Sequence, residues 1–211
     1  MNTQSVNPET DTEFLVLVNP AAGGGQAGRR ADSLLQALHA AGIDFQHRLS
    51  DAPGGCRELA AEARQAGFRH FISVGGDGTA NEVVNGIFSV NSQDGPALLG
   101  VVPWGTGNDW ATYYGLPSQV DEFINLLRSG NRVQQDIGRV RFGGPRAERE
   151  HYFLNCTGTG FDSYLLARMG SGRGSRLRYL RYVLRSLVSY HASRLTLELP
   201  QRQITTCALM L

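Results

Sequence analysis

The sequence contains no lysine, so all 20 of its basic residues are arginines. This absence excludes every mechanism that needs a lysine amine. A Schiff-base lysine, the lysine of a phosphate-binding P-loop, a serine–lysine dyad and the ATP-binding lysine of protein kinases are all ruled out.

Cysteines and long apolar runs are also scarce. Cys56, Cys156 and Cys207 are widely spaced and form no CxxC pair, which favours free thiols in a reducing cytoplasm and argues against a structural zinc site. No apolar run approaches the length of a membrane span. Residues 1–12 are polar and acidic, which indicates a disordered tail rather than a signal peptide.

Charge is unevenly distributed although the net charge is only +1. The stretch 163–197 contains seven arginines and no acidic residue, which leaves 13 arginines against 19 acidic residues elsewhere. Hydrophobic residues make up 41% of the chain and charged residues 18%, as in an ordinary globular protein.

Apolar strand-like runs alternate with helical patterns over residues 13–130. This alternation predicts an open, mostly parallel α/β sheet. The expected strands are 14–18, 43–49, 68–74 and 98–102, and the expected helices lie around 31–38, 57–66, 79–88 and 119–127, with a short helix after residue 109.

The pattern changes after Gly130. Residues 133–142 and 151–157 are typical of an antiparallel pair with a turn at 143–145, and 194–199 with 204–211 of another. We therefore expect a domain boundary near residue 131 and a partial β-rich second domain over 131–211, which includes an arginine-rich helix.

Three glycine-rich loops follow predicted strands. They read NPAAGGG from Asn19, GGDGT from Gly75 and PWGTGND from Pro103. Because ligands of open α/β sheets bind outside the carboxyl ends of the strands, the three loops are expected to converge on one site.

Two familiar phosphate-binding motifs do not fit these loops. GGGQAGRR, from Gly23, has the glycine spacing of a P-loop but carries arginines where lysine and Ser/Thr belong. GGDGT is not GxGxxG, and no acidic residue stands at the end of a next strand about 20 positions on, so a Rossmann dinucleotide site is weakly supported.

The GGDGT loop offers a different way to bind phosphate. Gly75, Gly76 and Gly78 leave backbone N–H groups uncovered, and Thr79 adds a hydroxyl near a helix N-terminus. Asp77 beside phosphates requires a divalent cation, so a role through Mg²⁺ is one interpretation. The alternative is a tight turn in which Asp77 caps the helix.

The joint occurrence of these motifs resembles the diacylglycerol kinase catalytic-domain family, which includes bacterial lipid kinases, sphingosine kinases and ceramide kinases. The resemblance covers the chain from Phe14 onward. It rests on Asn19-Pro20, on residues 75–82 (GGDGTANE) and on 103–109 (PWGTGND). Weaker matches are SDAPG from Ser50, in place of the family's TxxPG turn, and the segments 136–138 and 155–162.

The resemblance implies an α/β fold like that of NAD kinase and 6-phosphofructokinase, followed by the beginning of a β-sandwich domain, with ATP between them. Asp77, Asp109 and Asp136 would form an acidic, water-linked Mg²⁺ network and take part in catalysis. The residues that would contact the nucleotide are Asn19, Pro20, Ala21, Ala22, Gly23, Ser50, Gly75, Gly76, Asp77, Gly78, Thr79, Asn81 and Thr106.

The family pattern continues beyond the strand expected at 204–211, into a further glycine-rich loop, metal-binding acids and a carboxylate proposed as general base. We therefore expect a truncated chain that holds most of the ATP site and lacks the base that would deprotonate the lipid hydroxyl.

Residues 175–190 (SRLRYLRYVLRSLVSY) are amphipathic at helical spacing. One hypothesis is peripheral membrane contact, on the inner face of the membrane, through Arg178, Arg181 and Arg185. The alternative is a helix that packs its leucines on the β-domain and leaves its arginines solvated. No recognised motif supports nucleic-acid binding.

Other residues of reactive type carry no catalytic pattern. The five histidines show no ligand spacing, Trp104 and Trp110 are expected to pack under the PWGTGND loop, and Glu82 is expected to hold the GGDGT loop by a hydrogen bond.

Together, motifs and resemblance predict an ATP- and Mg²⁺-dependent lipid kinase that phosphorylates the hydroxyl of a diacylglycerol-like lipid, with a homodimer as a possible assembly. The alternatives are a non-catalytic ATP- or lipid-binding module and an NAD-kinase-type phosphotransferase, which shares GGDGT.

Overall fold

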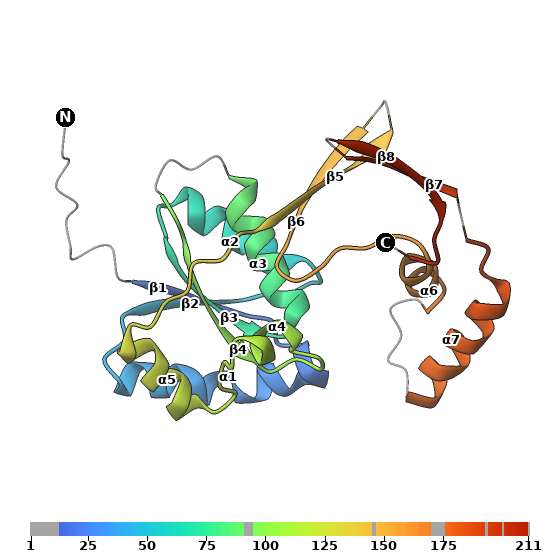
Figure 1. Cartoon of the computed structure of the whole chain (residues 1–211). Coiled ribbons are helices and arrows are strands. Elements are labelled where there is room, and N and C mark those ends of the chain that lie inside the picture. Colours follow the sequence, from blue (N-terminus) through green and yellow to red (C-terminus); the bar gives the residue numbers. More distant parts are fainter. Residues whose placement is uncertain are drawn as a thin grey trace, which may run out of the picture. The chain divides into compact units, whose positions relative to one another are not determined.

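The computed structural model describes residues 13–90, 95–144, 147–169, 176–192, 194–199 and 201–210 (Figure 1). The chain forms two compact units, one ending at Asn155 and the other beginning at Cys156. The tail predicted to be disordered, residues 1–12, lies outside the described residues.

The first unit contains a parallel sheet of four strands in the order β2-β1-β3-β4, which confirms the predicted α/β class. All four strands coincide with predicted apolar runs to within two residues at either end. Their bounds are β1 Phe14–Val18, β2 Phe45–Leu49, β3 His70–Gly75 and β4 Leu98–Pro103.

Five helices of this unit connect and cover the strands. They are α1 Ala22–Ala40, α2 Gly55–Gln65, α3 Asp77–Ser89, α4 Asp109–Tyr113 and α5 Val120–Ser129. Helices α1 and α5 pack on one face of the sheet, and α2 and α3 on the other (Figure 1).

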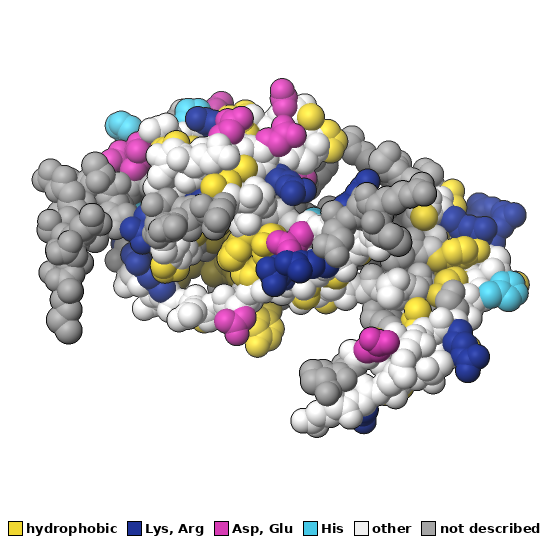
Figure 2. Space-filling view, turned by 90° about the horizontal axis from the view of Figure 1, so that it is seen from above, with side chains coloured by type: hydrophobic (Ala, Val, Ile, Leu, Met, Phe, Trp, Pro, Cys, Tyr) yellow, Lys and Arg dark blue, Asp and Glu magenta, His cyan; other side chains and the backbone are white. Residues whose placement is uncertain are grey.

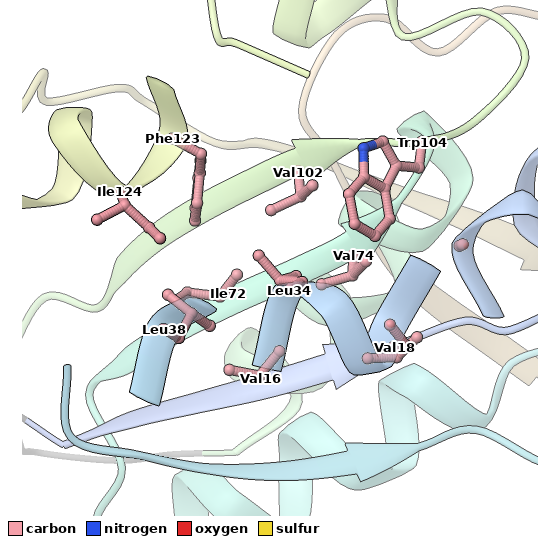
Figure 3. Close-up of a cluster of buried hydrophobic side chains, with 12 residues drawn as sticks. Val16, Val18, Leu34, Leu38, Ile72, Val74, Val102, Trp104, Phe123 and Ile124 are labelled. Carbon is pink, nitrogen blue, oxygen red and sulfur yellow. The ribbon is translucent and has the colours of Figure 1, made fainter. Parts of the chain in front are cut away.

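The core occupies both faces of the sheet, because successive side chains of a strand point to opposite sides. Val16 and Val18 pack with Leu34 of α1 and Phe123 of α5 in the cluster drawn in Figure 3. The alternate residues Leu15 and Leu17 pack against α2 and α3. A strand covered on both sides must be apolar throughout, which explains the continuous run FLVLV.

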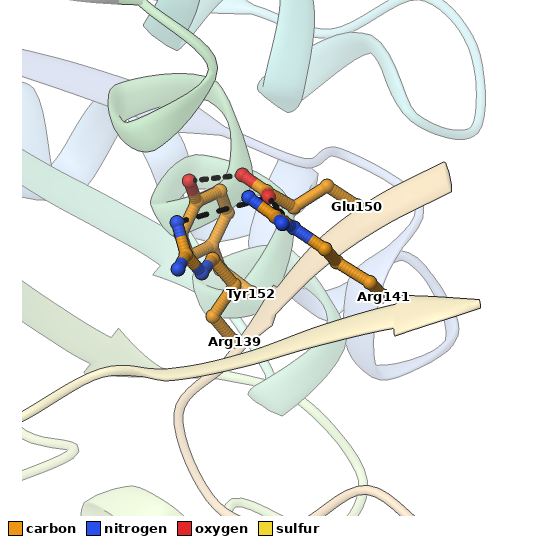
Figure 4. Close-up of polar contacts among 4 residues, drawn as sticks. All are labelled: Arg139, Arg141, Glu150 and Tyr152. Carbon is orange, nitrogen blue, oxygen red and sulfur yellow. Dashed lines mark hydrogen bonds and ion pairs between the residues drawn. The ribbon is translucent and has the colours of Figure 1, made fainter. Parts of the chain in front are cut away.

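Strands β5 (Gly138–Gly144) and β6 (Ala147–Phe153) form the predicted antiparallel pair. The predicted strand start at Val133 is wrong, because residues 131–137 have no regular structure. Residues 145 and 146 of the predicted turn lie outside the described residues. On this hairpin, Glu150 accepts hydrogen bonds from Arg141 Nε (2.8 Å) and the Tyr152 hydroxyl (2.6 Å) (Figure 4).

Asn85 of α3 holds the hairpin against the α/β part of the unit. Its amide donates to the Tyr152 carbonyl at 2.7 Å and accepts from the Tyr152 N–H at 2.9 Å, so it pairs with β6 as a neighbouring strand would. The compact unit therefore extends to Asn155, whereas the change of sequence pattern falls near residue 131, which stays a predicted domain boundary.

The second unit contains two helices and a strand pair. Its elements are α6 Phe161–Met169, α7 Arg176–Ser189, β7 Arg194–Leu199 and β8 Arg202–Cys207. Helix α6 is not predicted by the sequence pattern, and β8 ends at Cys207 rather than at the end of the chain. Strands β7 and β8 are antiparallel, as predicted.

Candidate functional site

The sheet has a topological switch point at the carboxyl end of β1. This strand lies between β2 and β3. The connection after β1 therefore runs toward one edge of the sheet, and the connection after β2 runs back past β1 toward the other edge. Ligands of open α/β sheets bind in the crevice that such a reversal creates. Two of the three glycine loops begin here, after β1 and after β3, and the third follows the adjacent β4.

Asn19, the first residue after β1, joins two of these loops. Its backbone N–H donates to the Val74 carbonyl at 3.1 Å, and its side-chain amide donates to the Thr79 hydroxyl at 3.1 Å. Its side-chain oxygen accepts from the N–H of Ala21, also at 3.1 Å. A residue predicted to contact the nucleotide therefore ties the loop after β1 to the first turn of α3.

Several glycines of the loops are required because backbone packs on backbone. A Cβ at Gly76 would lie 2.9 Å from the Gly105 Cα, and one at Gly105 would collide with the Gly76 Cα. A Cβ at Gly23 would collide with the Trp104 carbonyl oxygen. These glycines bring the three loops together, which is a different reason from the ligand approach that the sequence suggested.

Two other glycines face open space. A Cβ at Gly78, in the first turn of α3, would meet no atom within 4 Å, and neither would one at Gly24. Gly24 lies between Gly23 and Gly25 in a run of three positive φ angles (58°, 68° and 88°), a conformation that side chains disfavour. The backbone at Gly24 and Gly78 is therefore accessible to a ligand.

Asp77 connects the GGDGT loop to the loop after β4. Its Oδ2 accepts the backbone N–H of Asp109 at 3.0 Å, and its Oδ1 accepts that of Trp110 at 3.1 Å. The carboxylate thus satisfies two of the free N–H groups at the start of α4, where negative charge is favoured by the helix dipole. Asp77 caps a helix 32 residues away rather than its own.

Asn108 shapes the PWGTGND loop from within. It is the one described non-glycine residue with a positive φ (63°). Its side-chain oxygen accepts from the Gly105 N–H at 3.0 Å, and its amide nitrogen donates to the Pro103 carbonyl at 3.1 Å. Asparagine tolerates this conformation better than most residues, and its short amide closes the loop.

Ser50 belongs to a fourth loop, which lies between β2 and α2 and is contacted by Glu82. Ser50 is 7% exposed, and its hydroxyl is hydrogen-bonded with the Cys56 thiol. Glu82 of α3 accepts the Gly54 N–H at 3.1 Å. Glu82 is predicted to hold the GGDGT loop by a hydrogen bond. The structure corrects the partner, because Glu82 holds the SDAPG turn through Gly54.

Asn81 lies one turn along α3 from Asp77, and its amide nitrogen is 3.2 Å from His151 Nε2. Its side-chain oxygen is buried and has no hydrogen-bond partner among the described residues. Asn81 therefore has a buried acceptor atom that the described residues leave unsatisfied, and its nucleotide contact stays a prediction.

Asp136 lies in the irregular segment before β5 and is exposed. Its neighbour Gln135 accepts a hydrogen bond from Trp110 Nε1 at 2.8 Å and donates one to the Leu154 carbonyl at 2.9 Å. Within the described ranges, no group of three or more His, Cys, Asp or Glu side chains could hold a metal ion directly. The water-linked network of Asp77, Asp109 and Asp136 stays a prediction.

The remaining predicted contacts surround the same loops. Thr106 is exposed between Gly105 and Gly107, and Pro20 packs against Gly28 of α1. Sequence reasoning missed Asn108, Gln135 and Asn85 as residues that build the site. The only sequence signal for Asn108 is its place inside GTGND, and no local pattern identifies the other two.

Helix α7 carries the arginines of the membrane hypothesis. Arg181 and Arg185 are exposed, and the side chain of Arg178 lies outside the described residues. The leucines expected to be covered are exposed as well, 51% for Leu180 and 57% for Leu184. Hydrophobic and basic side chains both appear at the protein surface in Figure 2. No helix of the described residues is long and apolar enough to span a membrane.

Taken together, the fold and the loops define an α/β domain that presents several glycine-lined turns and two aspartates at one edge of its sheet. Comparison with known proteins identifies the class. The model of the diacylglycerol kinase catalytic domain matches residues 13–140, and the chain belongs to this family.

Individual relatives agree with this assignment. The chain is 30% identical over 166 residues to the "Probable lipid kinase YegS" of Escherichia fergusonii, which covers 76% of this chain and 53% of the relative. It is 29% identical over 174 residues to the protein of that name in Salmonella heidelberg, which covers 82% of this chain and 54% of the relative. The chain thus spans about half the length of these relatives.

Solved structures show the same fold. A crystal structure of a diacylglycerol kinase from Bacillus anthracis str. Sterne superposes with a TM-score of 0.66 at 23% identity, covering 94% of this chain and 62% of that one. Another from this organism gives 0.70 at 20% identity, covering 100% and 66%. The predicted NAD-kinase-like α/β fold is thereby confirmed.

Proposed function

We propose that this chain supplies the nucleotide-binding part of an ATP- and Mg²⁺-dependent lipid kinase, which transfers the γ-phosphoryl group of ATP to the hydroxyl of a diacylglycerol-like lipid. The observation that carries the proposal is the convergence of the three glycine loops at the switch point, tied together by Asn19 and Asp77. Membership of the diacylglycerol kinase family supports the reaction class.

The open backbone of the loops fits a triphosphate. Gly78 lies in the first turn of α3, where backbone N–H groups and the helix dipole favour phosphate oxygens. Gly24, in the loop after β1, likewise leaves its backbone uncovered by other protein atoms. The side-chain oxygen of Asn81 is buried and unpaired among the described residues, so a hydrogen bond to the nucleotide would require this oxygen to become exposed.

The carboxylates fit a magnesium ion held through water. Oxygens of Asp77 and Asp109 both lie within 4 Å of a Cβ position built on Gly107. Each Asp77 oxygen accepts one backbone N–H and keeps lone-pair capacity for a water ligand. When bound, Mg²⁺ would neutralise charge that develops on the phosphates during transfer.

The chain's own residues then act by orientation. The loops would fix the phosphates in line with the acceptor hydroxyl, and Asp77 would keep the loops in register by holding α4. The family resemblance implies a carboxylate as the general base that deprotonates the lipid hydroxyl, and no residue of this chain is assigned that role.

Contact with an anionic membrane surface through α7 is part of the proposal. Exposed Arg181 and Arg185 lie on the same helix as exposed Leu180 and Leu184, so basic and apolar groups are available together. Sedimentation with vesicles should fall on raising salt and in the double variant Arg181→Glu/Arg185→Glu. Equal binding by that variant contradicts the contact, while the phosphotransfer proposal is unaffected.

The central test is transfer of radiolabelled phosphate from ATP by the full-length protein across a panel of diacylglycerol, monoacylglycerol and sphingoid bases. We expect Asp77→Asn to lower kcat by roughly a hundredfold or more, since it removes a negative charge that would hold Mg²⁺ beside the phosphates. Unchanged transfer by Asp77→Asn would refute the role given to this carboxylate.

Because Asp77 also caps α4, stability must be measured beside activity. Asp109→Asn separates the two roles, since it removes a carboxylate of the proposed Mg²⁺ network and retains the backbone N–H that donates to Asp77, so it should lower transfer without loss of stability. Gly78→Ala should preserve the melting temperature and weaken ATP binding, because its Cβ would enter space that the protein leaves open.

The test also separates the alternatives. ATP affinity without transfer to any lipid indicates a non-catalytic binding module, and transfer to NAD indicates an NAD-kinase-type phosphotransferase.

A further inference from the structure

We propose that Trp110 and Gln135 are positioning residues that fix Asp136 relative to Asp77 and Asp109, and that they thereby set the Mg²⁺ requirement of nucleotide binding. The proposal rests on the function proposed above. It concerns two residues that neither the family motifs nor the sequence pattern assigns to the site.

The side-chain amide of Gln135 makes two hydrogen bonds, one through its oxygen and one through its nitrogen. The indole Nε1 of Trp110 donates to Gln135 Oε1 at 2.8 Å, and Gln135 Nε2 donates to the Leu154 carbonyl at 2.9 Å. Because one partner is a donor and the other an acceptor, the amide has a single orientation that satisfies both. Both side chains are partly buried, which strengthens these bonds relative to exposed ones.

The segment that carries Asp136 depends on this contact for its position. Residues 131–137 belong to no helix or strand, so no backbone ladder holds them. Gln135 precedes Asp136 directly, and consecutive Cα atoms are about 3.8 Å apart. A fixed Gln135 therefore restricts where the Asp136 carboxylate can reach.

Trp110 links this segment to the other two acids. It follows Asp109 in the chain, and its backbone N–H donates to Asp77 Oδ1 at 3.1 Å. Its indole packs on Tyr114 with ring centroids 4.9 Å apart, which limits rotation of the ring. One residue thus contacts Asp77 through its backbone and the Asp136 segment through its side chain.

The far end of the link is anchored as well. Leu154 follows β6, and β6 is held to α3 by the paired hydrogen bonds between Asn85 and Tyr152. Helix α3 begins at Asp77, so hydrogen bonds and chain connections link α3, β6, Gln135 and Trp110 in sequence and return to Asp77. Each residue in this ring of contacts is held from both sides and therefore resists displacement, as expected of groups that orient metal-binding acids.

The first measurement tests the contact without nucleotide. The chain has two tryptophans, so ¹H–¹⁵N spectra contain two indole signals, which Trp110→Phe and Trp104→Phe assign. In Gln135→Ala we expect the Trp110 indole signal to shift upfield and exchange faster with water. We also expect line broadening or intensity changes at the Asp136 amide in both Gln135→Ala and Trp110→Phe.

The second measurement tests the consequence for the metal. Calorimetric titration of the full chain with a non-hydrolysable ATP analogue, over a range of Mg²⁺ concentrations, gives the Mg²⁺ midpoint for binding. Loss of groups that orient metal-binding residues costs about 10- to 100-fold, so each single variant should raise the midpoint by about tenfold. The double variant should be no worse than the single ones, because both remove the same link.

Gln65→Ala is the control, since Gln65 is an exposed glutamine at the end of α2, and this end of α2 precedes the amino end of β3, opposite the end that carries the GGDGT loop. It should leave both readouts unchanged. A Mg²⁺ midpoint that stays constant in Gln135→Ala and Trp110→Phe overturns the proposal, and so do multiplicative effects in the double variant.

Failure of the proposed function gives a different result. If the wild type binds no nucleotide at any Mg²⁺ concentration, nucleotide binding is wrong, and the Asp136 amide then decides the positioning role alone. Identical Asp136 signals in wild type and variants overturn that role.

Discussion

The α/β unit and the unit that begins at Cys156 bury their apolar side chains to different extents. In the first, Leu15, Val16, Leu17 and Val18 along β1 are all at most 1% exposed. In the second, the described buried residues are Phe161, Leu165 and Ser186, while four apolar residues of α7 are 48–88% exposed: Leu180, Leu184, Leu187 and Val188.

The difference follows from how each unit covers its elements. A sheet with helices on both faces encloses every side chain of its central strands, so the first unit completes its core with residues 13–155. Helix α7 has an amphipathic sequence whose apolar stripe is uncovered by the described residues. Substitutions of apolar residues in the first unit should therefore disturb core packing, whereas substitutions in α7 should change only the exposed surface.

The largest expected contrast is between two leucine truncations. Leu34→Ala in α1 should lower the free energy of unfolding by about 2–5 kcal/mol, because Leu34 is fully buried and its loss leaves a cavity. Leu184→Ala in α7 should change it by less than about 0.5 kcal/mol, because that side chain is 57% exposed. Urea denaturation measures the free energy of unfolding of both variants. Equal losses would contradict the difference in burial between the two units.

A second prediction concerns the hairpin that follows the sheet. Asn85→Ala should cost about 1–3 kcal/mol, since the Tyr152 N–H and carbonyl each lose a partner in a buried setting. Hydrogen exchange at the Tyr152 amide should accelerate. Thr196→Ala, which removes an exposed hydroxyl contact between β7 and β8, is the control. A stable Asn85→Ala protein with a protected Tyr152 amide contradicts the role of Asn85 in holding the hairpin.

The smallest expected effect distinguishes the cysteines of the two units. Burial raises the pKa of the Cys56 thiol to about 11, opposed in part by the Ser50 hydrogen bond and supported to a smaller extent by the charge of Glu82. Since the thiolate is the reactive form, Cys56 should react with thiol reagents far more slowly than exposed Cys156 and Cys207. Mass spectrometry after timed labelling measures the order, and early labelling of Cys56 would contradict it.

The raised pKa of Cys56 also determines how the stability of the folded state changes with pH. The folded state keeps the Cys56 proton above the pH at which the unfolded thiol loses it, near 8.5. Stability from this group is therefore complete below about pH 8.5 and falls as pH rises toward about 11. Cys56→Ala should flatten the decline in melting temperature over that range.

Much of the fold could be predicted because its signals are local. The run FLVLV marks β1 with its observed bounds, and Leu34 and Leu38 fall on the buried face of α1 as their spacing indicates. Helix α6 was missed, and the strand start at Val133 was wrong. In the latter region the chain follows the hydrogen bonds of Gln135 instead of a ladder.

The sequence by itself determined the α/β class, the order of the elements in the parallel sheet and its helices, and the placement of the glycine loops at strand ends, because periodicity and turn residues act within a few positions. Only the tertiary structure decided what each residue does there. The partners of Asp77 are 32 and 33 residues away, and that of Asn85 is 67 residues away. Such contacts depend on how helices pack on the sheet, and no local pattern encodes that packing.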